Sequence, residues 1–567
     1  MPKSYRYPVY PYRRSADQDA SSPAHHPVIV VGAGPVGLSM AVDLGLRGIA
    51  TLLLDEDDTV SDGSRGICFA KRTLEIFDRL GVGDRIVEKG VTWNKGKVYS
   101  GDRLIYAFDL LPESGHKRPA FVNIQQYYIE DYLIERAGEI DGLDVRWKNR
   151  VIGVEPDADG VTVTVETPEG DYTLKCDYLI AADGAKSGVR DFLGLPFEGR
   201  SFEEQFLITD IVMSADFPAE RRFWFNPAFH DGQSALLHRQ PDDVWRIDLQ
   251  LDADADREAE GSPERTIPRL KAILGEDQPF EVDWTSVYRF RCARLEHFRE
   301  GRVFFVGDAA HIVSPFGARG GNAGIQDADN LAWKIAAVLE RKAPEALLAS
   351  YEAERIPAAD ENIRYSARST DFMTPKSRVN RIFRDAVLDL AERFAFARRM
   401  VNSGRLSTPS VYSDSPLNSP DAEDFLSGIP PGAAAADAPL KHGGWLIDHL
   451  GGGFAGLWFA SDPGEIDAAR ASALERLAAG GLPIRVFVVA PEGAEGAVHD
   501  LPVLVDRGGL AFERYDASGG AFYLFRPDQH VAARFRRLEI EPVNGALARA
   551  LGRDKSRSDT DARTAHG

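Results

Sequence analysis

Cysteine is scarce in this chain, and its scarcity excludes several classes of protein. Three cysteines are present, Cys68, Cys176 and Cys292, and no Cys-x-x-Cys pair occurs. They lie more than 100 residues apart, so they cannot form a disulfide framework, and we expect a reducing, cytoplasmic environment. The twelve histidines are scattered without the spacing of metal ligands, so no metal site is predicted.

The chain also lacks a run of basic residues and a long apolar segment. Its 67 Lys and Arg against 87 Asp and Glu give a net charge of −20, which argues against nucleic acid as a partner because phosphate binding needs local positive charge. The uncharged stretch 28–42 is shorter than the ~20 residues of a membrane-spanning helix, so no membrane association is predicted. Residues 1–27 contain no apolar core of a signal peptide and are expected to form a flexible tail.

What is present indicates a multidomain α/β protein. At 567 residues the chain is several times longer than a usual single domain. Strands are predicted at 28–31 and 51–54, with a helix between them that ends near Gly48, and this order is typical of a parallel sheet. Residues 200–291 are largely β in pattern, with one short helix predicted near residues 263–274, and a further helix is predicted at 466–478 in the C-terminal part. A long amphipathic helix is predicted from the apolar residues Val379, Ile382, Phe383, Ala386, Val387, Leu390 and Phe394.

A glycine-rich turn joins the first strand to its helix. The residues Gly32-Ala33-Gly34-Pro35-Val36-Gly37 fit G-x-G-x-x-G, and Asp55, followed by Glu56, ends the second strand. Glycines there permit a tight turn, a close approach of backbone to a pyrophosphate and close packing of the helix, whose N-terminus attracts phosphate. The acidic end of the second strand can accept hydrogen bonds from a ribose. A tight turn without a ligand is the alternative.

A second match to the same pattern serves as an internal control. Residues 451–456 also read G-x-G-x-x-G, but the apolar strand pattern of residues 457–460 follows them in place of a helix. Without a helix N-terminus the turn has no dipole with which to hold phosphate, so no site is predicted there.

Two further motifs accompany the first turn. Residues 183–190 (DGAKSGVR) follow a strand, and residues 307–311 (GDAAH) follow another and lead to Gly320-Gly321-Asn322, where a long helix is expected to begin. In this order the three motifs resemble those of the single-component FAD-dependent aromatic hydroxylases with the para-hydroxybenzoate hydroxylase fold, such as phenol hydroxylase and 3-(3-hydroxyphenyl)propionate hydroxylase. The resemblance covers roughly residues 28–370.

The resemblance implies an α/β architecture with an FAD-binding Rossmann-like domain, an inserted β-sheet substrate domain and a C-terminal thioredoxin-like domain. Because the C-terminal part has no Cys-x-x-Cys, it cannot exchange disulfides, and a structural or homodimer-supporting role is the better interpretation. The predicted parts are a flexible tail (1–27), the FAD-binding domain (28–199 and 292–403), the substrate-binding sheet (200–291), a linker (404–439), the thioredoxin-like domain (440–552) and a disordered tail (553–567).

The resemblance also assigns residues to the cofactor. Gly32, Gly34, Gly37 and Asp55 would hold the ADP half of FAD, and Arg65 would lie near the pyrophosphate. Gln126 would contact the flavin side, or is a surface glutamine. Asp308 would bind the ribityl chain, or caps a helix, and Asp183 would serve both FAD and the reduced pyridine nucleotide. The backbone N–H groups at Gly320, Gly321 and Asn322 would stabilise the negative charge of reduced flavin.

Three residues are candidates for contact with the substrate. By resemblance, the hydroxyl of Tyr288 would contact a phenol, although a tyrosine of the core fits the same strand pattern. The carbonyl of Pro315 is a weaker candidate. Arg319 departs from the family pattern, and it either receives an anionic group of substrate or flavin or pairs with Asp327 or Asp329.

The expected activity is hydroxylation of a phenolic compound, with phenolic acids among the candidate substrates, with FAD, NADH or NADPH and O₂, through a flavin C4a-hydroperoxide. Flavin halogenases and epoxidases share the fold, but the Trp-x-Trp-x-Ile-Pro motif of halogenases is missing, as is an anchoring segment for a membrane-bound epoxidase. A flavoprotein without turnover is the third alternative.

Overall fold

In the computed structural model the chain forms two compact units, and each contains its own sheets. Unit 1 comprises Met1–Pro112, Pro119–Ala328 and Ala359–Thr408, and unit 2 comprises Glu113–Arg118, Asp329–Ala358 and Pro409–Gly567. The structure describes residues 5–63, 66–215, 218–230, 233–401, 406–462, 472, 484–494 and 501–553.

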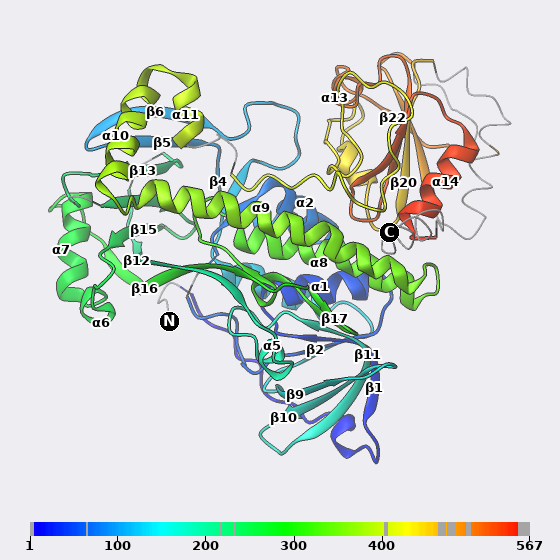
Figure 1. The fold of residues 1–567 in the computed structure, drawn as a ribbon, viewed down its shortest axis with the longest axis horizontal. Coiled ribbons are helices and arrows are strands. Elements are labelled where there is room, and N and C mark those ends of the chain that lie inside the picture. The colour runs from blue at the N-terminus through cyan, green and yellow to red at the C-terminus, as the bar shows by residue number, and fades with distance from the viewer. Residues whose placement is uncertain are drawn as a thin grey trace, which may run out of the picture. The chain divides into compact units, whose positions relative to one another are not determined.

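The first sheet of unit 1 is a parallel sheet with an antiparallel extension (Figure 1). Its strands, in spatial order, are β17 (Arg299–Glu300), β18 (Val303–Phe305), β11 (Tyr172–Ala181), β1 (Ala24–Val31), β2 (Thr51–Leu54) and β8 (Leu143–Arg146), with β10 (Val161–Glu166) and β9 (Arg150–Pro156) joined to β11. The last four residues of β1 and all of β2 are buried, as expected of apolar strands that are covered on both faces.

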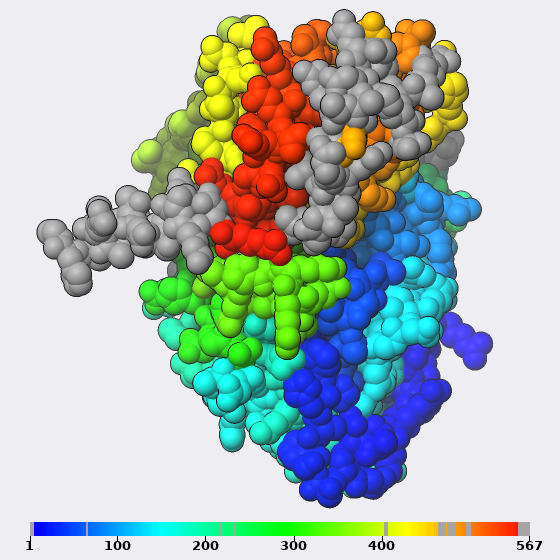
Figure 2. All heavy atoms as spheres, turned by 90° about the vertical axis from the view of Figure 1, so that its right-hand side faces the viewer, coloured from blue at the N-terminus to red at the C-terminus, as the bar shows by residue number. Residues whose placement is uncertain are grey.

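The N-terminal segment packs onto this sheet, where the sequence suggested a flexible tail. The ring of Tyr10 stacks on Trp147 at a centroid distance of 4.6 Å, and Arg14 pairs with Glu169 at 2.7 Å. Strand β1 begins at Ala24, four residues earlier than predicted. Figure 2 shows the first residues, in blue, lying against the cyan segment that holds β9 and β10. Tyrosines bury large apolar rings, which explains the packing of a segment that is otherwise polar.

The second sheet of unit 1 is built mainly from residues 198–312. Its order is β19 (His311–Ile312), β16 (Glu281–Arg294), β12 (Glu198–Val212), β15 (Val244–Leu251), β14 (Ser234–Arg239), β13 (Arg221–Phe225), β5 (Lys95–Ser100) and β6 (Arg103–Asp109). β5 and β6 lie outside the predicted insert. They join its sheet because β5 pairs in parallel with β13. A small third sheet consists of β3 (Cys68–Ala70), β7 (Phe121–Asn123) and β4 (Val91–Trp93).

The two faces of the second sheet bury different side chains. One face packs an aromatic cluster that includes Phe206, Phe290 and Phe316. The other packs an aliphatic cluster that includes Leu207, Ile247 and α7 residue Leu270. Alternation along the strands places neighbouring residues in different clusters, which is the period of two that a sheet buried on both faces requires.

The helices of unit 1 connect and cover these sheets. They are α1 (Pro35–Leu46), α2 (Lys71–Leu80), α3 (Gly83–Lys89), α4 (Gln126–Ala137), α5 (Gly188–Phe192), α6 (Arg257–Glu260), α7 (Pro263–Leu274), α10 (Arg378–Arg393) and α11 (Ala395–Val401), with the 3₁₀ turns η1 (Ala16–Asp19) and η2 (Gly307–Ala309). The long helices α8 (Gly320–Leu339) and α9 (Ala349–Met373) contribute to both units.

Unit 2 contains a five-stranded sheet. Its order is β22 (Val503–Val505), β21 (Ile484–Ala490), β20 (Phe454–Phe459), β23 (Ala521–Phe525) and β24 (Val531–Phe535), and its other described elements are η3 (Glu345–Leu348), η4 (Leu446–His449), α13 (Leu510–Arg514) and α14 (Ile540–Ala550). β20, β21 and β22 are parallel, whereas β23 and β24 are antiparallel. The thioredoxin-like assignment stays a prediction, and the helix predicted at 466–478 lies, except for residue 472, outside the described residues.

A buried charge network joins the helical and sheet parts of unit 2. Glu354 on α9 accepts hydrogen bonds from Lys334 on α8 at 2.8 Å and from Arg526 at 3.0 Å, and Arg526 also donates to Asp528 at 3.0 Å. All four side chains are fully buried. Burial lowers the pKa of Lys334 to about 8, although the carboxylate of Glu354 opposes this shift. The segment predicted as a linker also contributes, because Tyr412 is buried and accepts a hydrogen bond from Arg355.

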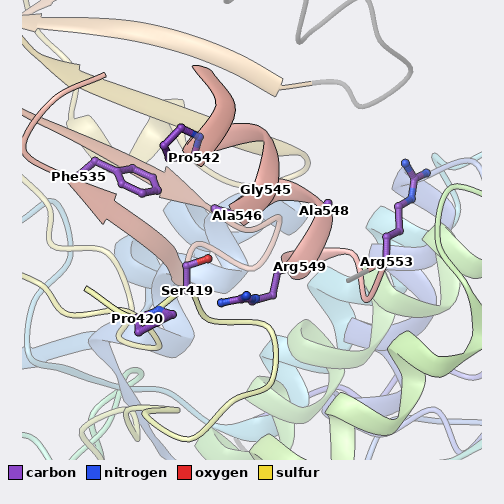
Figure 3. A pocket seen from close by; sticks show the side chains of 9 residues that line it. All are labelled: Ser419, Pro420, Phe535, Pro542, Gly545, Ala546, Ala548, Arg549 and Arg553. Carbon is purple, nitrogen blue, oxygen red and sulfur yellow. The ribbon is translucent and has the colours of Figure 1, made fainter. Parts of the chain in front are cut away.

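A shallow hollow of about 510 Å³ lies on unit 2, next to β24 and α14. Figure 3 shows the side chain of Arg549 extending toward Ser419, with Phe535 above them. The residues that line it include no carboxylate, histidine or cysteine, so it offers no acid–base pair for chemistry. Among the described residues, no helix is long and apolar enough to cross a membrane.

Candidate functional site

The three predicted motifs meet at the carboxyl ends of three neighbouring parallel strands. Val31 of β1 lies opposite Ala181 of β11, and Ala181 lies opposite Phe305 of β18. The turn that begins at Gly32, the Asp183 loop and the Gly307 turn therefore leave the sheet at one edge. In open α/β sheets ligands bind at this edge.

Glycine is required for the motifs to approach one another. Gly32 has φ of +102°, and a Cβ there would lie 2.6 Å from the carbonyl oxygen of Ala182. A Cβ on Gly37 would lie 1.9 Å from the carbonyl oxygen of Gly32, and one on Gly324 would lie 2.7 Å from Val36. The turn is thus clamped against the second motif on one side and against α8 on the other.

The first turn has the form of an anion site. Gly34 is the N-cap of α1, and a Cβ on it would meet no atom within 4 Å, so there is room for a ligand against the backbone. Asp55 accepts hydrogen bonds from the N–H groups of Ala33 and Asp57, and burial raises its pKa. Glu56 points to solvent and pairs with Arg150 at 3.3 Å, which does not place it in the turn.

Asp183 has an unused oxygen at the same edge. Its Oδ2 accepts a hydrogen bond from the N–H of Val189 at 3.0 Å, while its Oδ1 is buried and has no partner among the described residues. Burial raises the pKa of Asp183. A buried oxygen without a donor is costly unless a ligand supplies one.

Arg190, the last residue of the second motif, has a bridging role that was not predicted from the sequence. Its guanidinium donates to the carbonyl oxygens of Ala309 at 3.2 Å and Ala185 at 2.9 Å, which ties the second motif to the third. The motif spacing offers a signal for this role, since only a long side chain with several donors can bridge two loops.

The third motif exposes the carboxylate of Asp308 to solvent, while the side chains that hold this turn in place are buried. Asp308 is exposed in η2. Asp327 accepts hydrogen bonds from the N–H of Gly307 at 3.0 Å and from His311 at 2.7 Å, and the His311 and Asp327 side chains are fully buried. Asp308 is thus held at the strand end with its carboxylate accessible.

The N-terminus of α8 has a backbone open to a ligand, but its asparagine is structural. A Cβ on Gly321 would meet no atom within 4 Å. The side chain of Asn322 accepts from the N–H of Ala70 at 2.8 Å and donates to the carbonyl oxygen of Cys68 at 2.9 Å. Its amide therefore fixes β3 beneath the helix, so that Asn322 can offer a cofactor only its backbone.

Gln126 positions the loop that carries Arg65. Its Oε1 accepts from the N–H of Gly66 at 3.0 Å, and its amide donates to Glu130 at 2.8 Å. Glu130 also accepts from the backbone N–H and hydroxyl of Ser61, both at 2.7 Å, and burial raises its pKa to about 7. Arg65 itself lies outside the described residues.

Comparison with known proteins agrees with this geometry. A family model described as "FAD binding domain" matches residues 25–366, which is more than half of the chain. The chain belongs to this family. FAD is therefore its cofactor, and the edge formed by Gly32, Gly34, Asp183, Asp308 and Gly321 offers open backbone at Gly34 and Gly321 and an unpaired carboxylate oxygen at Asp183, which suit FAD.

Several members of the FAD binding domain family are similar over nearly the whole chain. The 3-(3-hydroxy-phenyl)propionate/3-hydroxycinnamic acid hydroxylase of Mycolicibacterium smegmatis is 27% identical over 531 residues, covering 90% of this chain and 91% of that protein. The 6-methylpretetramide 4-monooxygenase of Streptomyces rimosus is 28% identical over 541 residues, covering 90% of this chain and 91% of that protein. The chain is an enzyme of this flavin-dependent monooxygenase kind.

The fold also matches a solved structure of the same kind. The flavin-dependent monooxygenase PieE in complex with FAD and substrate superposes with a TM-score of 0.79 at 22% identity, covering 94% of this chain and 100% of that one. This similarity confirms the predicted α/β fold.

In this family member, Tyr288 lies on the aromatic face of the second sheet. It packs with the cluster around Phe206 and Phe316, and Phe316 belongs to the loop that leads into α8. No described residue forms a hydrogen bond with the Tyr288 hydroxyl. The carbonyl of Pro315 already accepts from the N–H of Ala318 at 3.0 Å, which leaves it one lone pair.

Arg319 is directed toward α9. It is buried, it donates to Asn362 at 3.0 Å, and its guanidinium lies 4.9 Å from the ring centroid of Tyr365. Burial lowers its pKa. Asp327, one of the two carboxylates considered as its partner, accepts instead from Gly307 and His311. These contacts favour a structural role for Arg319.

A polar cluster that the sequence did not indicate lies on the same sheet face as Tyr288. Arg221 is 9% exposed and its Nε has no partner among the described residues. Nε2 of His238 lies 3.8 Å from Oδ2 of Asp248. Nδ1 of His238 and Oδ1 of Asp248 also have no hydrogen-bond partner among the described residues. Burial raises the pKa of Asp248 to about 6, although Arg246 and Arg221 oppose this shift. We call Arg221, His238 and Asp248 the polar cluster.

The polar cluster is close to β3, which α8 holds. The thiol of Cys68 interacts electrostatically with Arg221, Arg246 and Asp248, and burial raises its pKa to about 11. The Cys68 carbonyl is the group that Asn322 binds. The Cys68 side chain thus lies within electrostatic range of the cluster, and its backbone is bound by the residue near the start of α8. Scattered positions in three strands give no sequence signal, which is why the cluster was missed.

Proposed function

We propose that this enzyme hydroxylates a phenolic aromatic compound, using FAD, O₂ and NADH or NADPH. The observation that carries the proposal is the pairing of an FAD edge, formed by three motifs, with a sheet face that holds an unpaired tyrosine hydroxyl and an unpaired buried arginine. Similarity to an aromatic hydroxylase over most of the chain supports it, and favours it over a halogenase.

The cofactor, when bound and reduced, supplies the activated oxygen. The protein's own residues would place the substrate and keep water away. We expect the Tyr288 hydroxyl to donate a hydrogen bond to the phenol oxygen and so favour its ionised form, whereas the Pro315 carbonyl, the weaker candidate, would accept a hydrogen bond from a substrate hydroxyl. The rings of Phe206, Phe290 and Phe316 would exclude water from the ring that reacts.

The geometry of the sheet favours a substrate with more than one ring. Tyr288 lies on β16 and Arg221 on β13, and three strands separate them. In the register of the sheet Tyr288 is level with Phe225, and Arg221 lies four residues from Phe225 along β13. With ~4.8 Å between neighbouring strands and ~3.4 Å per residue, the backbone positions of Tyr288 and Arg221 stand roughly 23 Å apart on the sheet. A single-ring phenol cannot contact both, whereas a fused polycyclic phenol with an oxygen substituent at its far end can reach the polar cluster.

The test is a panel of single-ring and polycyclic phenols, with NAD(P)H consumption and product mass as readouts. We expect a polycyclic phenol to stimulate NAD(P)H oxidation and gain one oxygen atom. Arg221→Met should raise KM for that substrate by about 10–100-fold, since a charged hydrogen bond is lost. The control is Arg222→Met, which alters the neighbouring residue on the opposite face. NAD(P)H oxidation that no phenol stimulates would contradict the proposal.

A further inference from the structure

The first described residues of the chain lie along helix α4 and are anchored there by tyrosines. The ring of Tyr5 stacks on that of Tyr127 at a centroid distance of 4.1 Å. The hydroxyl of Tyr10 donates a hydrogen bond to Asp131 of the same helix at 3.3 Å. Aromatic rings bury a large apolar area when they stack, so this segment has a fixed path. We call residues 5–10 the N-terminal strap.

The N-terminal strap also holds residues 57–63, which form the loop after β2. Three hydrogen bonds join the two segments, and each side supplies both donors and acceptors. They run from the N–H of Tyr10 to the carbonyl oxygen of Asp58 at 2.7 Å, from the hydroxyl of Thr59 to the carbonyl oxygen of Pro8 at 2.6 Å, and from the N–H of Gly63 to the hydroxyl of Tyr7 at 3.2 Å. Only the last bond depends on a side chain of the strap, so a substitution of Tyr7 can remove it alone.

Two other elements of unit 1 contact the same loop. Ser61 donates from its N–H and from its hydroxyl to Glu130 of α4, both at 2.7 Å. A Cβ on Gly63 would lie 2.6 Å from the indole ring of Trp284 on β16, so the backbone of Gly63 packs directly on this ring. The loop is therefore held by the strap, by α4 and by the second sheet, and it can shift only if one of these contacts breaks.

The loop acts on the cofactor edge through Asp55. The Oδ1 atom of Asp55 accepts a hydrogen bond from the N–H of Asp57 at 2.8 Å, and its Oδ2 atom accepts one from the N–H of Ala33 in the glycine-rich turn. Asp57 is the first residue of the loop, so the loop supplies one of the two donors that orient this carboxylate. A shift of the loop would remove that donor and reorient the group that is expected to bind the ribose of FAD.

We propose that the N-terminal strap retains FAD by holding the loop after β2, and that Tyr7 is a positioning residue of the cofactor site. A segment opens locally at a free energy set by the contacts that the opening breaks. The strap adds three hydrogen bonds to this set. It therefore makes openings of the loop rarer, and FAD, which leaves during such openings, dissociates more slowly.

Dissociation of FAD from the full-length holoenzyme tests the proposal, with flavin fluorescence after dilution as the readout. Tyr7→Phe keeps the ring and removes the acceptor for Gly63, so we expect the dissociation rate to rise by about 3–10-fold. The matched control is Tyr12→Phe, which removes a hydroxyl that donates to Gln18 at 2.9 Å, beyond the strap. The control should dissociate FAD at the wild-type rate, and the apoproteins of both variants should keep the wild-type melting temperature.

A double variant shows whether the strap and α4 hold one loop. Ser61→Ala removes the hydroxyl bond to Glu130 and should by itself speed the dissociation of FAD. Because both bonds hold the same loop, the combined variant should differ by at least about 3-fold from the product of the two single effects. A wild-type rate for Tyr7→Phe, an equal rise for Tyr12→Phe, a lower apoprotein melting temperature without faster FAD loss, or single effects that simply multiply would overturn the proposal.

Discussion

Two turns in this protein have the same glycine pattern, but one leads into a helix and the other into a strand. Gly32–Gly37 of unit 1 connects β1 to α1, and its backbone faces open space at Gly34. Gly451–Gly456 of unit 2 connects directly to β20, and Gly456 already lies within that strand. A Cβ on Gly456 would lie 2.6 Å from the ring of Phe522, so this glycine serves packing within a sheet.

The difference shows what makes a glycine pattern a binding site. Both turns contain glycines at positive φ, including Gly32 and Gly452. A helix N-terminus follows the first turn and supplies unpaired N–H groups, whereas a strand follows the second and pairs its N–H groups with β21 and β23. The turn in unit 1 is therefore suited to hold a cofactor phosphate, whereas the turn in unit 2 builds a sheet.

The largest contrast is expected from equivalent substitutions in the two turns. Gly32→Ala places a Cβ 2.6 Å from the Ala182 carbonyl oxygen at φ of +102°, and FAD binding should be lost. Gly452→Ala meets no atom within 4 Å, so it should keep one FAD per chain and cost about 1 kcal/mol from its positive φ. Flavin absorbance per chain measures the first effect and denaturant unfolding the second. Equal FAD content in both variants would contradict the comparison.

A substitution in the buried charge network of unit 2 should lower the free energy of unfolding and leave FAD binding unchanged. Arg526→Met leaves the carboxylates of Glu354 and Asp528 buried with one partner fewer, so the free energy of unfolding should fall by about 3–5 kcal/mol. Glu340→Gln alters an exposed ion pair of the same unit and should change it by less than about 0.5 kcal/mol. Urea titration with flavin release monitored in parallel gives both quantities. A folded Arg526→Met protein that lacks FAD would show that unit 2 takes part in cofactor binding.

A smaller effect is expected at the exposed carboxylate of the third motif. Asp308→Ala removes a hydrogen-bond acceptor without removing core volume, so the dissociation constant of FAD should rise by about 10–100-fold. The melting temperature of the apoprotein should stay unchanged. Isothermal titration of apoprotein with FAD measures the constant. Asp308→Asn, which keeps one oxygen acceptor, should lose less, and an unchanged constant for Asp308→Ala would refute the assignment.

The smallest effect concerns pH and the polar cluster. The pKa of Asp248 is raised to about 6, so its carboxylate balances the charge of Arg221 above pH 6 and ceases to do so below it. An aromatic acid that remains ionised should therefore bind about 3-fold more tightly at pH 5.5 than at pH 7.5. Asp248→Asn should abolish this dependence. Because the folded pKa lies above the unfolded one, protonation of Asp248 stabilises the fold at low pH, and this contribution is lost as pH rises through about 6.

Local sequence patterns predicted much of the fold. The strand Thr51–Leu54 and the helix Pro263–Leu274 have the predicted ends, because caps and apolar periodicity are local signals. The cofactor edge was predictable too, since each motif carries its own glycines and directly follows a strand. By contrast, the predicted amphipathic helix α10 lies where expected, but the residues Val379, Ile382 and Phe383 are exposed and not part of the core. Periodicity alone does not show which apolar positions the fold buries.

Properties that depend on pairing between distant strands were not predictable. Arg221, His238 and Asp248 converge because β13, β14 and β15 are neighbours, and nothing in the sequence near each residue shows this. The same holds for β5, which joins a sheet of residues far from it in sequence. The contact that Arg319 makes with Asn362 on α9 was likewise not visible from its position beside a glycine turn, and its role toward substrate or flavin stays a prediction.

Transfer of oxygen is the central claim, and isotope labelling tests it most directly. The holoenzyme is supplied with NAD(P)H, ¹⁸O₂ and the phenol that most stimulates NAD(P)H oxidation, and the product is analysed by mass spectrometry. Because a monooxygenase places one atom of O₂ in its product and reduces the other to water, we predict a hydroxylated aromatic that carries a single ¹⁸O atom. An unlabelled hydroxylated product, or NAD(P)H consumption that yields only hydrogen peroxide with every phenol tested, would contradict the account.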